Sequence, residues 1–197
     1  MILEGIVTSL NEDRSVRISP MGPIVDPLMT RIVLRPYPTS QTYANVTRSG
    51  QGVFHVTDDV EMIARAAVQG IETMPPFLRA GAVDGVILSG VCRWYAFRLA
   101  RTDHRGERIC MECEVVDSGR LRDFFGFNRA KHAVLEAAIL ATRVRRLPAE
   151  EIRTEFRRLG TIIQKTGGDQ ESRALDFLIT YVCEALGLDH SGRGKVG

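Results

Sequence analysis

The chain has 197 residues, of which 44% are hydrophobic and 25% are charged, a balance typical of one soluble globular domain with an appended element. Its formal net charge of +2 excludes the overall positive field of a protein that gathers nucleic acid or anionic lipid, so any anion site is expected to be local. The sequence shows neither a signal-peptide pattern nor an apolar run of bilayer length, and we therefore expect a cytoplasmic protein with no membrane partner.

The first third of the chain is predicted to begin with a hairpin over residues 2–24, because aliphatic and β-branched residues flank the turn sequence NEDR. The second strand is expected to kink or end at Met21, Gly22 and Pro23. Residues 30–35 predict a short strand, and residues 39–48 predict a short helix that ends before SGQG.

The middle of the chain alternates further strands with one helix. GVFHVT predicts a strand, and DDVEMIARAAVQG predicts an amphipathic helix that is capped by Asp58 or Asp59 and stopped by Gly70. Residues 71–82 are expected to form a loop. Two long strands, over 91–103 and 107–117, are then joined by HRG in a hairpin.

The last third has a helical period. An alanine-rich helix is predicted within residues 128–144, a second begins at Pro148, and a third runs from a cap at Asp169 to a stop at Gly187. Strands therefore precede helices, which predicts an α+β fold. The expected domains are a barrel over 1–125, a helical subdomain over 126–190 that packs on it, and a flexible tail over 191–197.

The four cysteines do not predict a disulfide framework or a metal site. Cys110 and Cys113 have the spacing of zinc ligands, but a second pair is lacking. They also lie on a predicted strand, where positions three apart point to opposite faces. We read them as ordinary strand cysteines.

The stretch LRPYPTSQTYANV joins a strand to a helix and carries many short hydrogen-bonding groups. A helix start exposes unpaired amides and the positive end of the helix dipole, which together bind phosphate. Thr39, Ser40 and Thr42 add hydroxyl groups, and Arg35 adds a planar pair of donors. Asn45 lies one turn further on. The alternative is that these residues only cap the helix and that Arg35 is solvated.

The motifs EGIVTSLNEDRSVRISPMGPIV, LRPYPTSQTYANV and GVFHVTDD resemble the FMN-binding split barrel superfamily, which includes flavin reductases and pyridoxamine phosphate oxidases. The sequence is most similar to an uncharacterised, largely archaeal family within that group. The resemblance covers residues 2–60 by specific pattern. Ser40, Thr42 and Asn45 fit the S/T-x-T-x-x-N pattern that holds the flavin phosphate in such proteins. HVTD departs from the family by lacking an asparagine common at that strand.

The resemblance implies an antiparallel, Greek-key split β-barrel that binds FMN as a homodimer. Met21, Gly22 and Pro23 would offer the flavin ring a close, soft surface. Tyr37 or Tyr43 would stack on the ring or simply cover the barrel.

The function that follows from the resemblance is a flavin-dependent oxidoreductase that uses a reduced nicotinamide or deazaflavin and has no catalytic side chain. The alternatives are a flavin-binding electron carrier without turnover and a dimeric barrel for another phosphorylated ligand.

A second candidate anion site lies at FNRAKHA, where Asn128, Arg129, Lys131 and His132 crowd one helix start. Basic side chains oppose the dipole at that end of a helix, so a phosphate, a carboxylate or a partner subunit would neutralise them. The alternative is a solvated basic turn.

Overall fold

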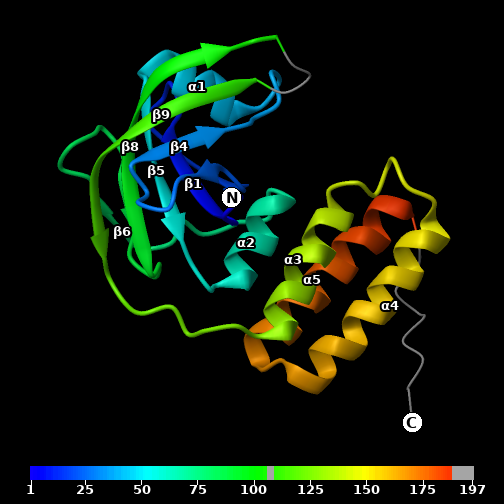
Figure 1. Cartoon of the computed structure of the whole chain (residues 1–197). Helices are drawn as coiled ribbons and strands as arrows, with labels where there is room; N and C mark the ends of the chain where they lie inside the picture. Colours follow the sequence, from blue (N-terminus) through cyan, green and yellow to red (C-terminus); the bar gives the residue numbers. More distant parts are fainter. Residues whose placement is uncertain (106–108, 188–197) are drawn as a thin grey trace. The chain divides into compact units, whose positions relative to one another are not determined.

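A computed structural model describes residues 1–105 and 109–187 (Figure 1). Their contacts divide into two compact units. The barrel unit consists of residues 1–58 and 73–125, and the helical unit consists of residues 59–72 and the chain from residue 126 onward. The second unit thus takes in a segment from the middle of the range expected for the barrel. The predicted tail over 191–197 lies outside the described residues.

The barrel unit is built on a seven-stranded antiparallel sheet with the order β2-β1-β5-β8-β9-β4-β3. Its strands are β1 (Gly5–Leu10), β2 (Val16–Met21), β3 (Ile24–Val25), β4 (Arg31–Leu34), β5 (Gln51–Val56), β8 (Arg93–Asp103) and β9 (Cys110–Arg120). The predicted strands and the α+β split-barrel fold are confirmed. The long hairpin of β8 and β9 is also confirmed, although part of its predicted HRG turn falls outside the described residues.

The first hairpin closes this sheet on itself. Its register runs from the pair Leu10 and Val16 to the pair Gly5 and Met21, and continues to a bridge between Ile2 and Ile24. Beyond the bend, β3 pairs with β4 at the other end of the sheet. One bent strand therefore serves both ends of the sheet, and the kink predicted at residues 21–23 is the corner of the barrel.

Gly22 lies at that corner close to two side chains of the N-terminal segment. A Cβ atom at this position would lie 2.6 Å from Glu4 Oε1 and 2.8 Å from Ile2 Cγ2, so these two side chains would have to move to make room for it.

One predicted loop contains a strand. β6 (Phe77–Arg79) lies within the range 71–82 that the sequence assigned to a loop, and it pairs with β7 (Val86–Leu88) in a separate two-stranded sheet. The prediction was wrong because β6 has three residues, all of them exposed, and so shows no alternation of buried and exposed positions. Thr8 fixes this hairpin to the barrel by donating a hydrogen bond to Val86 O (2.8 Å).

The helical unit contains α2 (Val60–Ala67), α3 (Arg129–Ala141), α4 (Ala149–Thr166) and α5 (Asp169–Leu186). Its core joins the small residues of α3 to larger apolar side chains of α4, as the helical periods predict. The buried residues of α4 are Ile152, Phe156, Leu159 and Ile163. Ile179 of α5, which the period places on the buried face, is 39% exposed.

Two helix ends differ from the sequence prediction. At the end of α2 the left-handed residue is Gln69 (φ 59°), while Gly70 donates its N–H to Arg65 O (2.8 Å). Gly70 is instead required by packing, because a Cβ there would lie 2.4 Å from Phe177 Cζ. At the start of α5 the cap is Gly168, one residue before the predicted Asp169, and its N–H donates to Glu171 Oε2 (2.8 Å).

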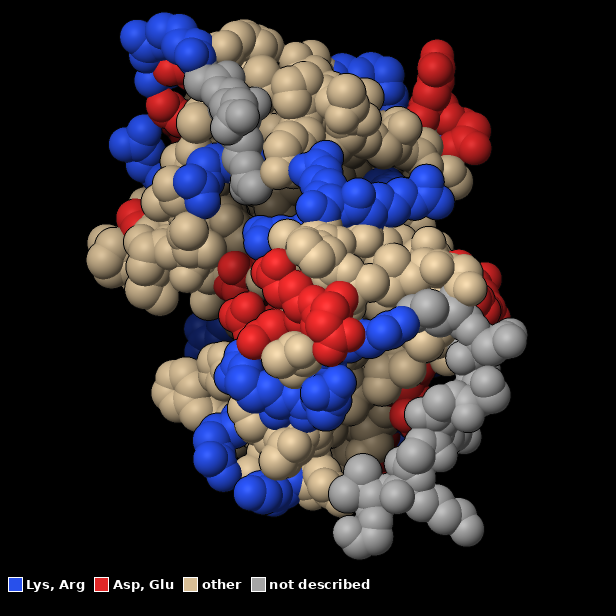
Figure 2. Space-filling view, turned by 90° about the vertical axis from the view of Figure 1, so that its right-hand side faces the viewer, with Lys and Arg blue, Asp and Glu red and all other residues tan. Residues whose placement is uncertain are grey.

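The molecular surface carries both signs of charge, and acidic and basic side chains both occur on the face shown in Figure 2. Among the described residues, no helix has the length and apolar character needed to span a membrane.

His55 is a fully buried polar residue at the centre of the barrel unit. Its Nδ1–H donates to Ile6 O (3.3 Å), and its Nε2 accepts from the Leu88 N–H (3.3 Å), so the neutral ring satisfies both partners. Burial lowers the pKa of His55 to about 4. The ring therefore links β5 to β1 and to β7 only in its neutral form.

This buried ring predicts a loss of stability in mild acid. Between pH 6.5 and about 4 the unfolded chain binds a proton that the folded chain does not, so the free energy of unfolding falls by roughly 3 kcal/mol as the pH falls. Urea titrations read by fluorescence of the single tryptophan, Trp94, will measure this loss in the barrel. His55→Gln should abolish this dependence of the free energy of unfolding on pH. Val53→Ala, a buried apolar change on the same strand, should lower the free energy of unfolding but keep its dependence on pH. A constant difference between wild type and His55→Gln across this range would contradict the assignment.

Candidate cofactor-binding site

The predicted junction of a strand and a short helix is confirmed, because β4 leads into α1 (Gln41–Ser49), and the candidate site is considered from this junction. Ser40 is the N-cap of this helix, and its Oγ accepts a hydrogen bond from the Tyr43 amide (3.2 Å). No acidic residue occupies the first turn. The first amides of any helix have no partner within it, so the amides of Gln41 and Thr42 remain at the positive end of α1.

Arg35 lies directly before this junction, at the end of β4. Its Nε is the one buried side-chain nitrogen or oxygen in the described part of the chain that lacks a hydrogen-bond partner. Such an atom costs about 1–3 kcal/mol when it is left unsatisfied. A guanidinium forms strong, planar hydrogen bonds with phosphate or carboxylate oxygens. An anion at this position would therefore remove an energetic cost that the protein alone carries.

Thr42 is turned toward the barrel rather than toward solvent. Its side chain is buried, and its Oγ1 donates to Ser19 Oγ on β2 (2.8 Å). Arg17 Nε also donates to Ser19 Oγ (3.3 Å). The hydroxyl hydrogen of Thr42 is thus used within the chain, and this contact fixes the first turn of α1 to the first hairpin.

Asn45 makes the same kind of contact one turn later. Its Nδ2 donates to Ser9 Oγ (3.0 Å) and to Asn11 Oδ1 (2.8 Å), and its Oδ1 accepts from Gln41 Nε2 (2.9 Å). Arg48 extends the row by donating to Leu10 O (2.6 Å). A row of polar side chains, spaced three residues apart, therefore holds α1 against the hairpin.

The remaining predicted positions in the barrel unit differ in exposure. Tyr37 is 50% exposed and Thr39 is exposed, while Tyr43 is half-buried and lies edge-on to His104, with ring centroids 6.4 Å apart. At the barrel corner Met21 is half-buried against the core and Pro23 is buried. Of the two tyrosines, Tyr37 is the more exposed residue.

The polar partners on the hairpin were missed from the sequence. Ser9 and Ser19 are buried on strands whose other inward residues are mostly apolar, and each receives a hydrogen bond from α1. A buried serine on a strand requires a partner, and that was the available signal. The sequence alone did not indicate which helix would supply the partner.

Asn128 and Arg129 belong to the helical unit. Asn128 is the N-cap of α3: its Oδ1 accepts from the amides of Ala130 (2.8 Å) and Lys131 (3.1 Å), and its Nδ2 donates to Thr166 O (2.9 Å). Arg129 is exposed. The described contacts thus give Asn128 a capping role and leave the Arg129 side chain on the surface.

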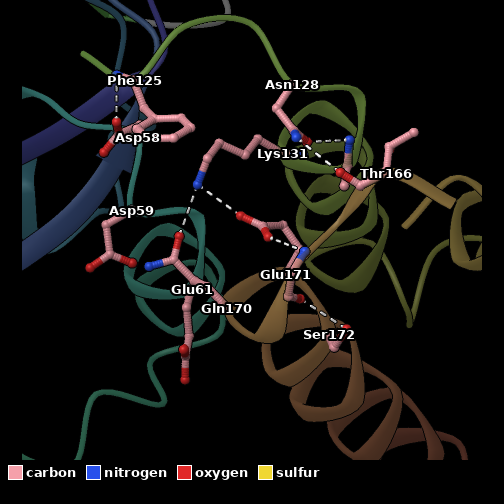
Figure 3. A network of polar contacts seen from close by, with 12 residues as sticks. Asp58, Asp59, Glu61, Phe125, Asn128, Lys131, Thr166, Gln170, Glu171 and Ser172 are labelled. Carbon is pink, nitrogen blue, oxygen red and sulfur yellow. Dashed lines mark hydrogen bonds and ion pairs between the residues drawn. The ribbon is translucent and has the colours of Figure 1, made fainter. Parts of the chain in front are cut away.

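Lys131, from the same basic cluster, is neutralised by a carboxylate of its own chain (Figure 3). Its Nζ lies 2.8 Å from Glu171 Oε1 and 3.0 Å from Gln170 Oε1 at the start of α5. Burial alone raises the pKa of Glu171, but the hydrogen bonds from Lys131 and from the Gly168 amide outweigh burial and hold the pKa below its ordinary value. The sequence named a carboxylate as one neutralising group, and the structure supplies it within the helical unit.

Two family profiles match the chain. Residues 3–122 match the N-terminal domain of the protein of unknown function DUF447, and residues 128–180 match a second DUF447 domain. The chain belongs to the DUF447 family. A search of curated proteins found no match to it.

Solved structures place this DUF447 chain among split barrels. It is similar to an FMN-bound DUF447 protein of Methanosarcina mazei, with a TM-score of 0.77 and 21% identity over 91% of this chain and 94% of that one. The styrene monooxygenase flavin reductase of Pseudomonas putida S12 aligns with a TM-score of 0.51 and 12% identity, over 61% of this chain and 82% of that one. Flavoredoxin of Desulfovibrio vulgaris aligns with a TM-score of 0.51 and 13% identity, over 60% and 69%. The split-barrel resemblance is thereby confirmed for the fold.

The polar row under α1 predicts unequal effects of two neighbouring substitutions. Asn45→Ala should lower the free energy of unfolding of the barrel by about 2–3 kcal/mol, because it leaves buried groups of the hairpin unsatisfied. Gln41→Ala, an exposed position that loses one hydrogen bond to Asn45, should cost about 1 kcal/mol or less. Trp94 fluorescence during urea unfolding will measure both values. Equal costs would show that Asn45 does not anchor the helix.

Proposed function

We propose that the protein binds FMN, with the phosphate group at the junction of β4 and α1. The observation that carries the proposal is the buried, unpartnered Nε of Arg35, at the end of the strand that leads to an N-terminal helix turn without acidic residues. The FMN-bound DUF447 protein of Methanosarcina mazei supports this choice of anion, because it has the same fold over nearly the whole chain.

In the proposed site, Arg35 donates to phosphate oxygens, and the amides at the start of α1 donate with it. The hydroxyl groups of Thr39 and Ser40 lie on the same short loop and can add donors. Thr42 and Asn45 hold the helix start in position through the hairpin. Because these two residues are satisfied within the chain, the site is formed before the ligand arrives and binding requires little ordering.

The flavin ring is proposed to lie against the barrel corner at Met21, Gly22 and Pro23, with Tyr37 as the covering aromatic residue. A polarizable methionine suits a flat ring system, and the half-exposed tyrosine offers a stacking face. Within the helical unit, Arg129 is proposed as an anion contact of its own at the start of α3, where Asn128 acts only as the cap.

The activity that we propose is that of a flavin-dependent oxidoreductase in a homodimer. FMN, when bound, supplies hydride acceptance from a reduced nicotinamide or a deazaflavin and electron transfer to an acceptor. The residues of this chain bind the phosphate, orient the ring and exclude water from it. The similarity to a flavin reductase supports turnover, and the similarity to flavoredoxin supports an electron carrier as the second candidate.

The phosphate assignment predicts that Arg35→Ala weakens FMN binding by about 10- to 100-fold, because one charge-assisted contact contributes about 1.5–3 kcal/mol. Quenching of flavin fluorescence will give the Kd. Arg31→Ala, an exposed arginine on the same strand paired with Glu112, is the matched control and should bind FMN normally. Riboflavin, which lacks the phosphate, should bind wild type and Arg35→Ala equally. An unchanged Kd for FMN in Arg35→Ala would refute the assignment.

Anaerobic addition of NADH or NADPH to the FMN-loaded protein separates the two candidate functions. Loss of flavin absorbance identifies an oxidoreductase that accepts a nicotinamide donor. An unchanged spectrum with both reductants, together with reversible chemical reduction of the bound flavin, favours the electron carrier.

A further inference from the structure

The chain crosses between the barrel unit and the helical unit three times: between Asp58 and Asp59, between Glu72 and Thr73, and between Phe125 and Gly126. The local contacts on each side of a crossing determine how much freedom the chain has there. The three crossings differ sharply in these contacts.

The first and third crossings are tied to one carboxylate on the barrel side. Asp58 is 6% exposed, and its Oδ2 accepts a hydrogen bond from the Phe125 amide (2.9 Å), as Figure 3 shows. Its Oδ1 forms an ion pair with Arg122, whose Nε also donates to Gly90 O (3.0 Å). The last residue of the barrel unit at one crossing thus binds the last residue at the other.

The next side chains along both crossings belong to the helical unit. Asp59, directly after Asp58, caps α2 by accepting from the Met62 amide (2.9 Å). In the other crossing the first anchored residue is Asn128, which caps α3 by accepting from the Ala130 amide (2.8 Å). The Phe127 ring before it lies roughly parallel to that of His132 but is 96% exposed. The Asp58–Asp59 peptide in one crossing, and Gly126 with Phe127 in the other, therefore lie between the anchors.

Gly126 has the properties of a pivot residue. Its φ is 114°, in the region that favours glycine, and a Cβ placed there would meet no heavy atom within 4 Å. The glycine at this position is therefore explained by its backbone conformation and not by packing.

The second crossing has a longer segment without backbone hydrogen bonds between its two fixed ends. On the helical side Gly70 is held by its bond to Arg65 O, and on the barrel side Pro76 O accepts from the Ser89 amide (2.9 Å). The five residues between these two positions, 71–75, belong to no helix or strand. Among the described residues, none of the backbone hydrogen bonds in turns and loops involves them. This segment does not oppose rotation about the other two crossings.

We propose that the helical unit rotates as a rigid body about a hinge formed by the Asp58–Asp59 peptide and Gly126. Two short, adjacent crossings that are fixed on both sides define a single axis, and the segment over 71–75 follows the motion. Asp58 keeps the two pivots together. This inference does not depend on the proposed FMN binding.

Pulsed electron paramagnetic resonance on the full-length chain tests the hinge. Spin labels at Ser118→Cys on β9 and Gln164→Cys on α4, with Cys110 and Cys183 replaced by serine, report the distance between units. Labels at Leu28→Cys and Ser118→Cys report a distance within the barrel unit. The inter-unit distribution should be the broader of the two, and Gly126→Ala should shift its mean and narrow it. Asp58→Asn should broaden it further.

Gly50→Ala is the matched control, because Gly50 also has a positive φ (68°) and open space around its Cβ position but lies away from the crossings. It should leave the inter-unit distribution unchanged. An inter-unit distribution as narrow as that within the barrel would overturn the hinge. If the inter-unit distribution is broad, and Gly126→Ala gives the same distribution as Gly50→Ala, the assignment of Gly126 as the pivot is overturned.

Discussion

The bend of the first hairpin is the constraint on which the barrel depends. Residues 16–25 pair with β1 on one side of the corner and with β4 on the other, so one continuous strand closes the sheet. That closure places the polar residues of the hairpin beneath α1, where Ser9 and Ser19 receive hydrogen bonds from the helix. The position of the helix start, and with it the proposed phosphate site, follows from the way in which the barrel closes.

Much of the fold was predictable because local chemistry and long-range packing agree. The kink at residues 21–23, the helix start at Ser40 and the buried face of α4 each follow from residue types at fixed spacings. The misses occurred where a distant contact decides. Gly70 is required by the Phe177 ring from α5 and not by the end of α2, and Glu171 makes Gly168 the cap of α5 in place of Asp169.

The candidate site shows the same division. The sequence located the junction and named Arg35, Ser40, Thr42 and Asn45, but it could not tell which side chains face outward. Residues three apart share one face of a helix, so Thr42 and Asn45 share a direction, and the serines on the hairpin decide that this direction is inward. The partner of Lys131 could not be predicted from the sequence either, because Glu171 lies 40 residues further along the chain.

The polar residues at the junction therefore divide into two groups with different energetic roles. Thr42 and Asn45 have their hydrogen bonds satisfied by the hairpin, which keeps α1 in place without any ligand. Arg35 Nε is buried and unsatisfied, which is costly in the free protein and favourable once an anion accepts from it. In such a site the internal hydrogen bonds fix the position of the helix start, and one strong donor, Arg35 Nε, has no partner within the chain and can donate to the ligand. Affinity for the anion then depends mainly on Arg35 and the helix amides, while the polar row beneath α1 determines whether those donors point to a common position.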